Sequence, residues 1–119
     1  MWKGGKGLYN YVFLVGRLVR DIEVRKTEGG RDVSTMCLAV TRPFKNPQTN
    51  TYDTDFINIS LWEPVVGNVA EYSHKGDAIA VKGRLQTRKE EVNGKNVYTQ
   101  EIVAERVMFL SSTKGQEVA

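Results

Sequence analysis

Flat aromatic rings interleaved with cations are the residues of this chain whose types and spacing best support chemistry. Within the run 56–62, Phe56 and Trp62 bracket Asn58 and Ser60. Because alternate side chains of a strand point to the same face, these four would share one face, and the three aliphatic residues between them would point to a core. Two large rings on a polar face indicate a binding surface, although the rings could also pack under a helix or in a subunit interface.

Cations accompany aromatic rings in other segments too. Phe44 stands between Arg42 and Lys45, and Arg84 and Arg88 share one face of a later alternating run. An unpaired nucleic-acid strand offers flat base faces and a charged backbone, so a site for it needs exposed aromatics together with Arg and Lys. The guanidinium group of Arg can also stack on a base. The pattern predicts a surface for single-stranded nucleic acid, with a solvated basic face as the alternative.

Catalytic and metal chemistry is poorly supported. The chain has one Cys and one His, which excludes an internal disulfide and a zinc site built from these two residue types. Cys37 is expected to be a small buried hydrophobe, and His74 a residue at a helix end. Asp53 and Asp55 have the spacing of paired carboxylates, but their Thr- and Asn-rich surroundings predict solvated loop acids. We therefore expect no enzyme activity, no metal and no cofactor.

The composition fits one folded domain with a polyanionic partner. The 119 residues include 17 Lys and Arg and 14 Asp and Glu, for a net charge of +3, and 40% are hydrophobic. The excess positive charge lies toward the two ends of the chain, which suits a polyanion. No apolar run is long enough for a membrane span, and no signal-peptide core is present. Together with the single cysteine, this predicts a reduced, cytoplasmic setting.

Turn residues divide the chain into short β-rich runs that must position these side chains. The first run is continuously apolar, as for a strand covered on both sides, and Gly16 within it suggests a bend. A helix is expected to begin at Pro64 and to carry His74 and Lys75 in its last turn. The expected strands cover residues 11–20, 33–41, 56–62, 78–88 and 97–110, with segment 22–25 paired nearby and a hairpin turn at Asn93-Gly94.

Three strands, a helix and two further strands match the connectivity of the OB-fold. We therefore expect an all-β protein with a five-stranded Greek-key barrel and one helix between the third and fourth strands. Fold analogy alone assigns no function. An OB-fold module that binds another protein, such as a primosome component, and an OB-fold that binds oligosaccharides are the alternative functions.

Motifs along most of the chain carry a more specific likeness. They are VFLVGRL at Val12–Leu18, LAVTRPF at Leu38–Phe44, DFINISLW at Asp55–Trp62, Lys75-Gly76, GRLQTR at Gly83–Arg88 and VYTQEI at Val97–Ile102. With these motifs the chain resembles bacterial-type single-stranded DNA-binding proteins. The resemblance implies an OB-fold over residues 9–110 that usually assembles as a homotetramer. It implies binding of single-stranded DNA, without strong sequence preference, in replication, recombination and repair.

The resemblance also assigns roles to individual residues. Phe44, Phe56 and Trp62 are the expected stacking rings. Our own interpretation of the cations adds the expected phosphate contacts, which are Lys6, Arg17, Arg42, Lys75, Arg84, Arg88 and Lys89. One departure is Glu90, which stands where the family commonly has a fourth aromatic and is followed by Glu91. We expect weaker or differently routed DNA binding around that hairpin.

The two ends of the chain are expected to lie outside the folded domain. Residues 1–8 are expected to form a flexible basic arm, and residues 111–119 a short disordered C-terminus. Replicative members of the family end in an acidic tip that recruits other proteins, and no such tip is present at 115–119. The resemblance therefore implies single-stranded DNA and further copies of the chain as partners, without tail-mediated protein partners and without a membrane.

Overall fold

Six strands and one helix make up residues 9–111, the part of the chain that this computed structural model describes. The expected basic arm 1–8 lies outside the described residues, as does the expected C-terminal segment apart from residue 111. The elements are β1 Val12–Leu18, β2 Arg25–Lys26, β3 Asp32–Lys45, β4 Tyr52–Trp62, α1 Val65–Tyr72, β5 Ala78–Val92 and β6 Lys95–Ser111.

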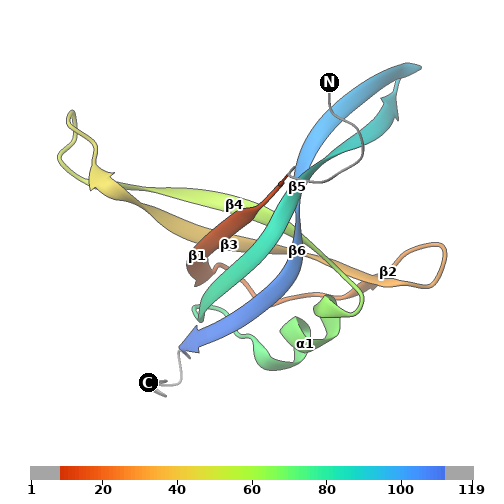
Figure 1. Cartoon of the computed structure of the whole chain (residues 1–119), viewed down its shortest axis with the longest axis horizontal. Helices are drawn as coiled ribbons and strands as arrows, with labels where there is room; N and C mark the ends of the chain where they lie inside the picture. The colour runs from red at the N-terminus through yellow and green to blue at the C-terminus, as the bar shows by residue number, and fades with distance from the viewer. Residues whose placement is uncertain (1–8, 112–119) are drawn as a thin grey trace.

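Five of the strands close into a barrel. The sheet order is β1-β5-β6-β4-β3-β2, and β1 also pairs with β3, which joins the two sides of the sheet. β4 and β6 run parallel, whereas the other pairs are antiparallel. α1 follows the third barrel strand and lies against one end of the barrel (Figure 1). This architecture is the OB-fold, as predicted, with the short β2 added at the edge of β3.

Two glycines allow the strands to approach closely enough for closure. A Cβ atom on Gly16 would lie 2.5 Å from the carbonyl oxygen of Ala39, and one on Gly83 would lie 2.3 Å from that of Val103. Both neighbours are backbone atoms, so the position of a side chain is already occupied. A bend was predicted at Gly16; the structure shows a close approach of β1 to β3 there, which leaves no room for a side chain.

The barrel interior contains the aliphatic rows expected from strand alternation. Ile59 and Leu61 of β4 are fully buried, and they pack with Met36 and Leu38 of β3. The helix adds two buried valines to the same core. Cys37 is buried and free, as predicted for a small hydrophobe. The inward face of β4 is therefore committed to the core, which leaves the other face available to a ligand.

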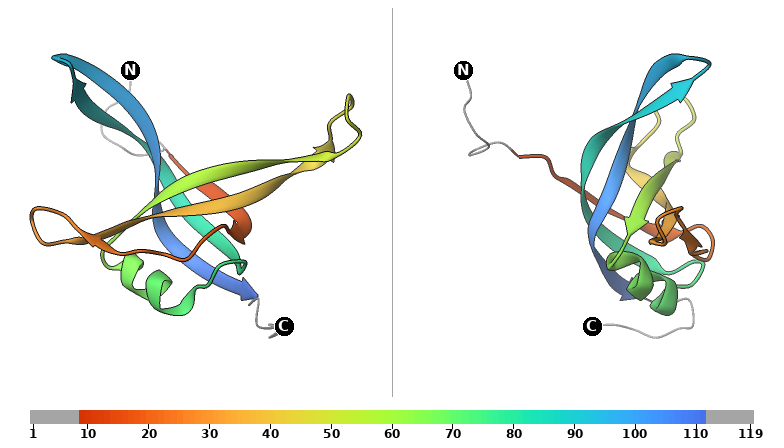
Figure 2. Two further views of the ribbon diagram at one scale, coloured as in Figure 1. Left: turned by 180° about the vertical axis from the view of Figure 1, so that it is seen from behind. Right: turned by 90° about the vertical axis from the view of Figure 1, so that its right-hand side faces the viewer.

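Two hairpins project from the barrel in different directions (Figures 1 and 2). The β3–β4 hairpin turns through residues 46–51, and the β5–β6 hairpin turns at Asn93-Gly94. Asn93 and Gly94 have φ of 53° and 77°, which is the backbone of the predicted tight turn. The strands of the two hairpins extend beyond their predicted ends, because pairing continues outside the core as far as Lys45–Tyr52 and Val92–Lys95.

The helix is shorter than predicted. It ends at Tyr72, and Ser73 is already extended, with φ −101° and ψ 152°. The N–H of His74 donates to Asp77 and the N–H of Lys75 donates to Asp21, both at 2.8 Å. These carboxylates satisfy backbone donors in a loop, so His74 and Lys75 follow the helix instead of completing its last turn.

β1 is covered on one side only within a single chain. Phe13 and Val15 are 51% and 46% exposed, whereas the continuous apolar run predicted a strand covered on both sides. β1 pairs with β3 only through Arg17 and Leu18. The edge of residues 12–16 that faces β3 therefore lacks a partner strand within the described part of the chain.

Candidate nucleic-acid interface

The outward face of β4 presents the predicted rings. Phe56 is 67% exposed and Trp62 is 41% exposed, although both belong to a strand whose other face is buried. Neither ring is packed under the helix, which was one of the alternatives for this run. Rings held on a rigid strand at fixed spacing offer flat apolar surfaces without a large loss of side-chain entropy on binding.

Phe56 shares a cross-strand row with a cation. Arg17 pairs with Ala39 across β1 and β3, and Ala39 pairs with Phe56 across β3 and β4. Directly paired residues of antiparallel strands point to the same face, so the guanidinium group and the ring lie on one surface with a small residue between them. Arg17 also donates to the carbonyl oxygen of Gly76 at 2.9 Å, which places it beside the loop that contains Lys75.

Trp62 lines two surface cavities, each together with one arginine of β5. It lines a cavity of about 450 Å³ together with Arg84. It also lines a second cavity of about 290 Å³ together with Arg88 and Ser60. The structure therefore brings the tryptophan together with both arginines predicted for the fourth barrel strand.

The arginines of β5 are not free cations. Nε of Arg84 lies 4.0 Å from a carboxylate oxygen of Glu105. Arg88 lies 3.7 Å from Glu101 of β6 and 3.8 Å from Glu90. Glu90, which stands where the resemblance implies an aromatic, thus lies beside Arg88. The pairs with Glu105 and Glu101 join β5 to β6, and the pair with Glu90 joins alternate residues of β5. Sequence reasoning anticipated none of them.

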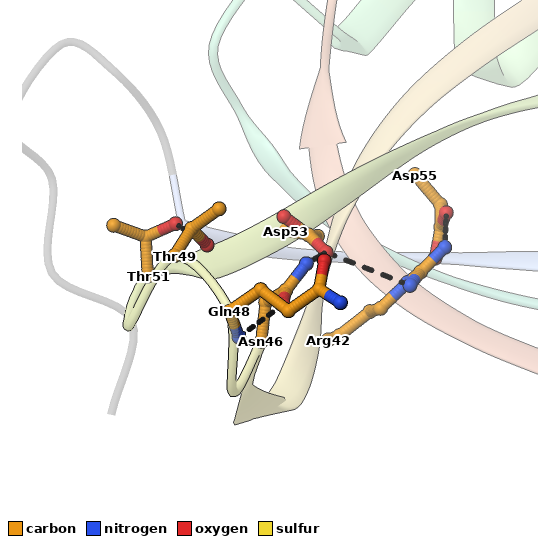
Figure 3. Close-up of polar contacts among 7 residues, drawn as sticks. All are labelled: Arg42, Asn46, Gln48, Thr49, Thr51, Asp53 and Asp55. Atoms are coloured by element: carbon orange, nitrogen blue, oxygen red, sulfur yellow. Dashed lines mark hydrogen bonds and ion pairs between the residues drawn. The ribbon is translucent and has the colours of Figure 1, made fainter.

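Arg42 is held more firmly than the other arginines (Figure 3). Its Nε and Nη2 donate to the two carboxylate oxygens of Asp55 at 3.0 and 2.9 Å, and Nη1 lies 3.7 Å from Asp53. The hydrogen bond from Arg42 lowers the pKa of Asp55 below its ordinary value, and the charge of Arg42 acts in the same direction. Asp53 and Asp55 are partly solvent-exposed, as predicted, but they do not lie in a loop, because both belong to β4 and pair with Arg42.

Hydrogen bonds within the β3–β4 turn fix the hairpin. Asn46 Nδ2 donates to Asp53 at 3.1 Å, and Asn46 Oδ1 accepts from the N–H of Gln48 at 2.9 Å. The hydroxyls of Thr49 and Thr51 lie 2.8 Å apart (Figure 3). A turn held in this way positions the strand ends that carry the exposed Phe44.

Tyr52 is a candidate that sequence reasoning missed. It is 54% exposed, and its even-numbered position places it on the same face of β4 as Phe56 and Trp62. Nζ of Lys45 lies 5.8 Å from the centre of its ring, within the range of a cation–π contact. The alternation of β4 contained the signal, but the strand was predicted to begin only at residue 56.

The remaining predicted cations are less closely tied to the rings. Lys89 pairs with Tyr98 across the β5–β6 hairpin and, as the neighbour of Arg88, points to the opposite face. Lys75 lies in the loop between α1 and β5. Lys6 lies outside the described residues.

Other kinds of site find no support in this part of the chain. Among residues 9–111, no group of three or more His, Cys, Asp and Glu side chains is arranged to hold a metal ion. Within the same range, no helix has both the length and the apolar character needed to cross a bilayer. The rings and arginines on the outer face of the barrel are therefore the best candidate site in the described structure.

A closed OB-fold barrel with exposed rings and arginines on one surface defines a binding module of the oligonucleotide type. The model of the single-strand binding protein family matches residues 9–110, and the chain belongs to this family. The family consists of DNA-binding proteins and not of enzymes.

Individual relatives agree with this assignment. The chain is 50% identical over 109 residues to single-stranded DNA-binding protein 3 of Listeria innocua, covering 91% of this chain and 68% of that protein. It is 39% identical over 113 residues to single-stranded DNA-binding protein B of Bacillus subtilis, covering 94% of this chain and 99% of that protein. A solved Plasmodium falciparum SSB complex with ssDNA is 26% identical and has a TM-score of 0.72, covering 89% of this chain and 98% of that one.

Proposed function

We propose that the chain binds single-stranded DNA without strong sequence preference and protects it during replication, recombination and repair. Bases stack on Phe44, Phe56 and Trp62, and the phosphates contact Arg and Lys side chains. The exposure of two large rings on the outer face of β4, with arginines on both sides, carries this proposal. The phosphate-contacting residues are Lys6, Arg17, Arg42, Lys75, Arg84, Arg88 and Lys89.

Stacking accounts for the lack of sequence preference. Every base has a flat π-face, so a ring accepts each of the four, and one base–aromatic stack is worth about 1–3 kcal/mol. The arginines add electrostatic attraction that is independent of sequence and weakens as salt rises. Together, stacking and electrostatic attraction suit a protein that must cover any exposed strand. We propose that it does so in the cytoplasm.

We further propose that the chain assembles as a homotetramer. Phe13 and Val15 of β1 are exposed apolar residues beside an unpaired strand edge, and such an edge is a liability in a lone chain. A second copy of β1 would cover both features. Light scattering after size-exclusion chromatography tests this directly, because a particle near 13.4 kDa, the mass of one chain, would refute assembly.

Binding of fluorescein-labelled oligo(dT), followed by anisotropy, tests the stacking assignment. Phe56→Ala and Trp62→Ala should each weaken binding by roughly 5- to 150-fold, the equivalent of one lost stack. Tyr72→Ala is a matched control, because Tyr72 is an exposed aromatic of α1 away from the candidate site. If both site variants bind as tightly as the control, the rings do not stack on DNA.

A further inference from the structure

Arg25 of β2 lies on the surface that carries Trp62. Arg25 pairs with Val33 across β2 and β3, and Val33 pairs with Trp62 across β3 and β4. Both steps join directly paired antiparallel residues, so the arginine and the tryptophan point to the same face. They lie two strand spacings apart, about 10 Å. Sequence reasoning gave Arg25 no role, because the row depends on the strand register.

The same arrangement occurs at Phe56, another exposed ring of β4. Phe56 lies two strands away from Arg17, with Ala39 between them. In each row the residue between the arginine and the ring leaves the surface open. Ala39 is small, and Val33 is buried. A base on the ring and a phosphate on the guanidinium group could therefore belong to one bound strand at both positions.

A cavity joins Arg25 to Trp62. Its volume is about 290 Å³, and its lining includes Arg25, Lys26, Arg88, Trp62 and Glu101. Three of these side chains are cationic and one is anionic, so the lining carries an excess of positive charge. The volume lies at the lower end of small-molecule sites, about 300–1,000 Å³, which fits one nucleotide better than a longer segment.

Among these cations, Arg25 has the most available charge. Lys26 is paired with Asp32 at 2.6 Å, and Arg88 is paired with Glu101. Glu101 in turn accepts a hydrogen bond from the hydroxyl of Ser60 at 2.9 Å. Arg25 forms no ion pair with any residue in the range 9–111. A phosphate can therefore bind Arg25 without displacing a carboxylate.

We propose that Arg25 and Trp62 form a subsite for one nucleotide of single-stranded DNA, with the base on the indole ring and the phosphate on the guanidinium group. The inference rests on the proposed function and adds β2 to the binding surface. It assigns Arg25 to the same nucleotide as Trp62, which is a stricter statement than general attraction between a cation and DNA.

The test compares Arg25→Gln with Arg31→Gln in the full chain, using oligo(dT) of about 15 nucleotides. Arg31 is an exposed arginine of the β2–β3 turn that does not line the cavity and lies 3.9 Å from Glu63. The two variants lose the same formal charge, so Arg31→Gln controls for net charge. Arg25→Gln should bind about tenfold more weakly, the effect of one lost charge-assisted contact. Its plot of log K against log salt should be shallower by about 0.7. Arg31→Gln should change affinity by less than about twofold.

A double-mutant cycle separates one shared nucleotide from two independent contacts. In a Trp62→Ala background, Arg25→Gln should cost clearly less than it does in the parent protein, because the nucleotide is no longer held there. Equal costs in the two backgrounds, or equal behaviour of the Arg25 and Arg31 variants, would overturn the subsite. If Trp62→Ala itself has no effect, the proposed stacking function fails as well, so the two failures are distinguishable.

Discussion

Replacing Asp55 with Asn should tighten DNA binding by releasing Arg42. In the free protein Arg42 makes two charge-assisted hydrogen bonds to Asp55, at 2.9 and 3.0 Å, and lies 3.7 Å from Asp53. A phosphate that binds Arg42 must compete with this carboxylate for the charge of the guanidinium group. Asn has nearly the same shape but no charge, so Asp55→Asn weakens the competitor while Asp53 and the hairpin remain.

The size of the effect follows from the exposure of the pair. Arg42 and Asp55 are each nearly half exposed, and water screens exposed pairs, so their mutual attraction is modest. Removing it should tighten binding of oligo(dT) by about two- to fivefold at low salt. The gain should shrink as salt rises, because screening weakens the carboxylate as a competitor in the parent protein.

A charge-matched control is needed, because the loss of any carboxylate makes the protein more positive and strengthens its attraction to DNA. Glu71 lies on α1, is exposed, and forms no ion pair among the described residues. Glu71→Gln changes the net charge by the same amount. If Asp55→Asn binds no tighter than Glu71→Gln in an anisotropy titration, the carboxylate is not a competitor. Weaker binding would mean instead that Asp55 orients Arg42 toward the DNA.

Three further predictions follow from other contacts. Gly83→Ala should destabilise the fold by about 1–3 kcal/mol, seen as a lower Tm, because its Cβ would lie 2.3 Å from the carbonyl oxygen of Val103; an unchanged Tm would contradict the close approach. Glu90→Tyr should tighten oligo(dT) binding by about fivefold or more through one new stack and one lost negative charge; Glu90→Gln isolates the charge, and equal gains would exclude stacking. Arg42 lowers the pKa of Asp55 below 3.8, so their pair should stabilise the fold above about pH 4. This stabilisation should be lost as pH falls through the pKa of Asp55 in the folded state. An NMR titration of Arg42→Gln should show a higher pKa for Asp55, and an unchanged pKa would refute the pairing.

Alternation was enough to predict which face of β4 is buried. The run 56–62 has a strictly apolar row, and Ile59 and Leu61 are accordingly buried while Phe56 and Trp62 are exposed. An Asn-Gly pair between two β runs strongly favours a two-residue hairpin turn, and Asn93-Gly94 forms that turn. These features depend on neighbouring residues alone, so local sequence contains the necessary information.

Features that depend on distant parts of the chain could not be predicted in this way. The helix stops at Tyr72 partly because Asp21, far away in sequence, accepts a hydrogen bond from the N–H of Lys75. The partner of Arg42 depends on the register of β3 and β4, which shifts between Thr41 and Lys45. The row from Arg25 to Trp62 likewise needs two registers to be known. No local pattern specifies which acid reaches which arginine.

The carboxylates that accompany Arg42, Arg84 and Arg88 have a consequence for selectivity. A polyanion such as heparin or a closed double helix presents charge but no accessible base faces, so it must compete with these acids by electrostatics alone. An unpaired strand can displace the same acids while its bases cover the exposed rings. At the proposed site, these acids would therefore disfavour duplex DNA, which is abundant wherever a short stretch of unpaired strand must be found.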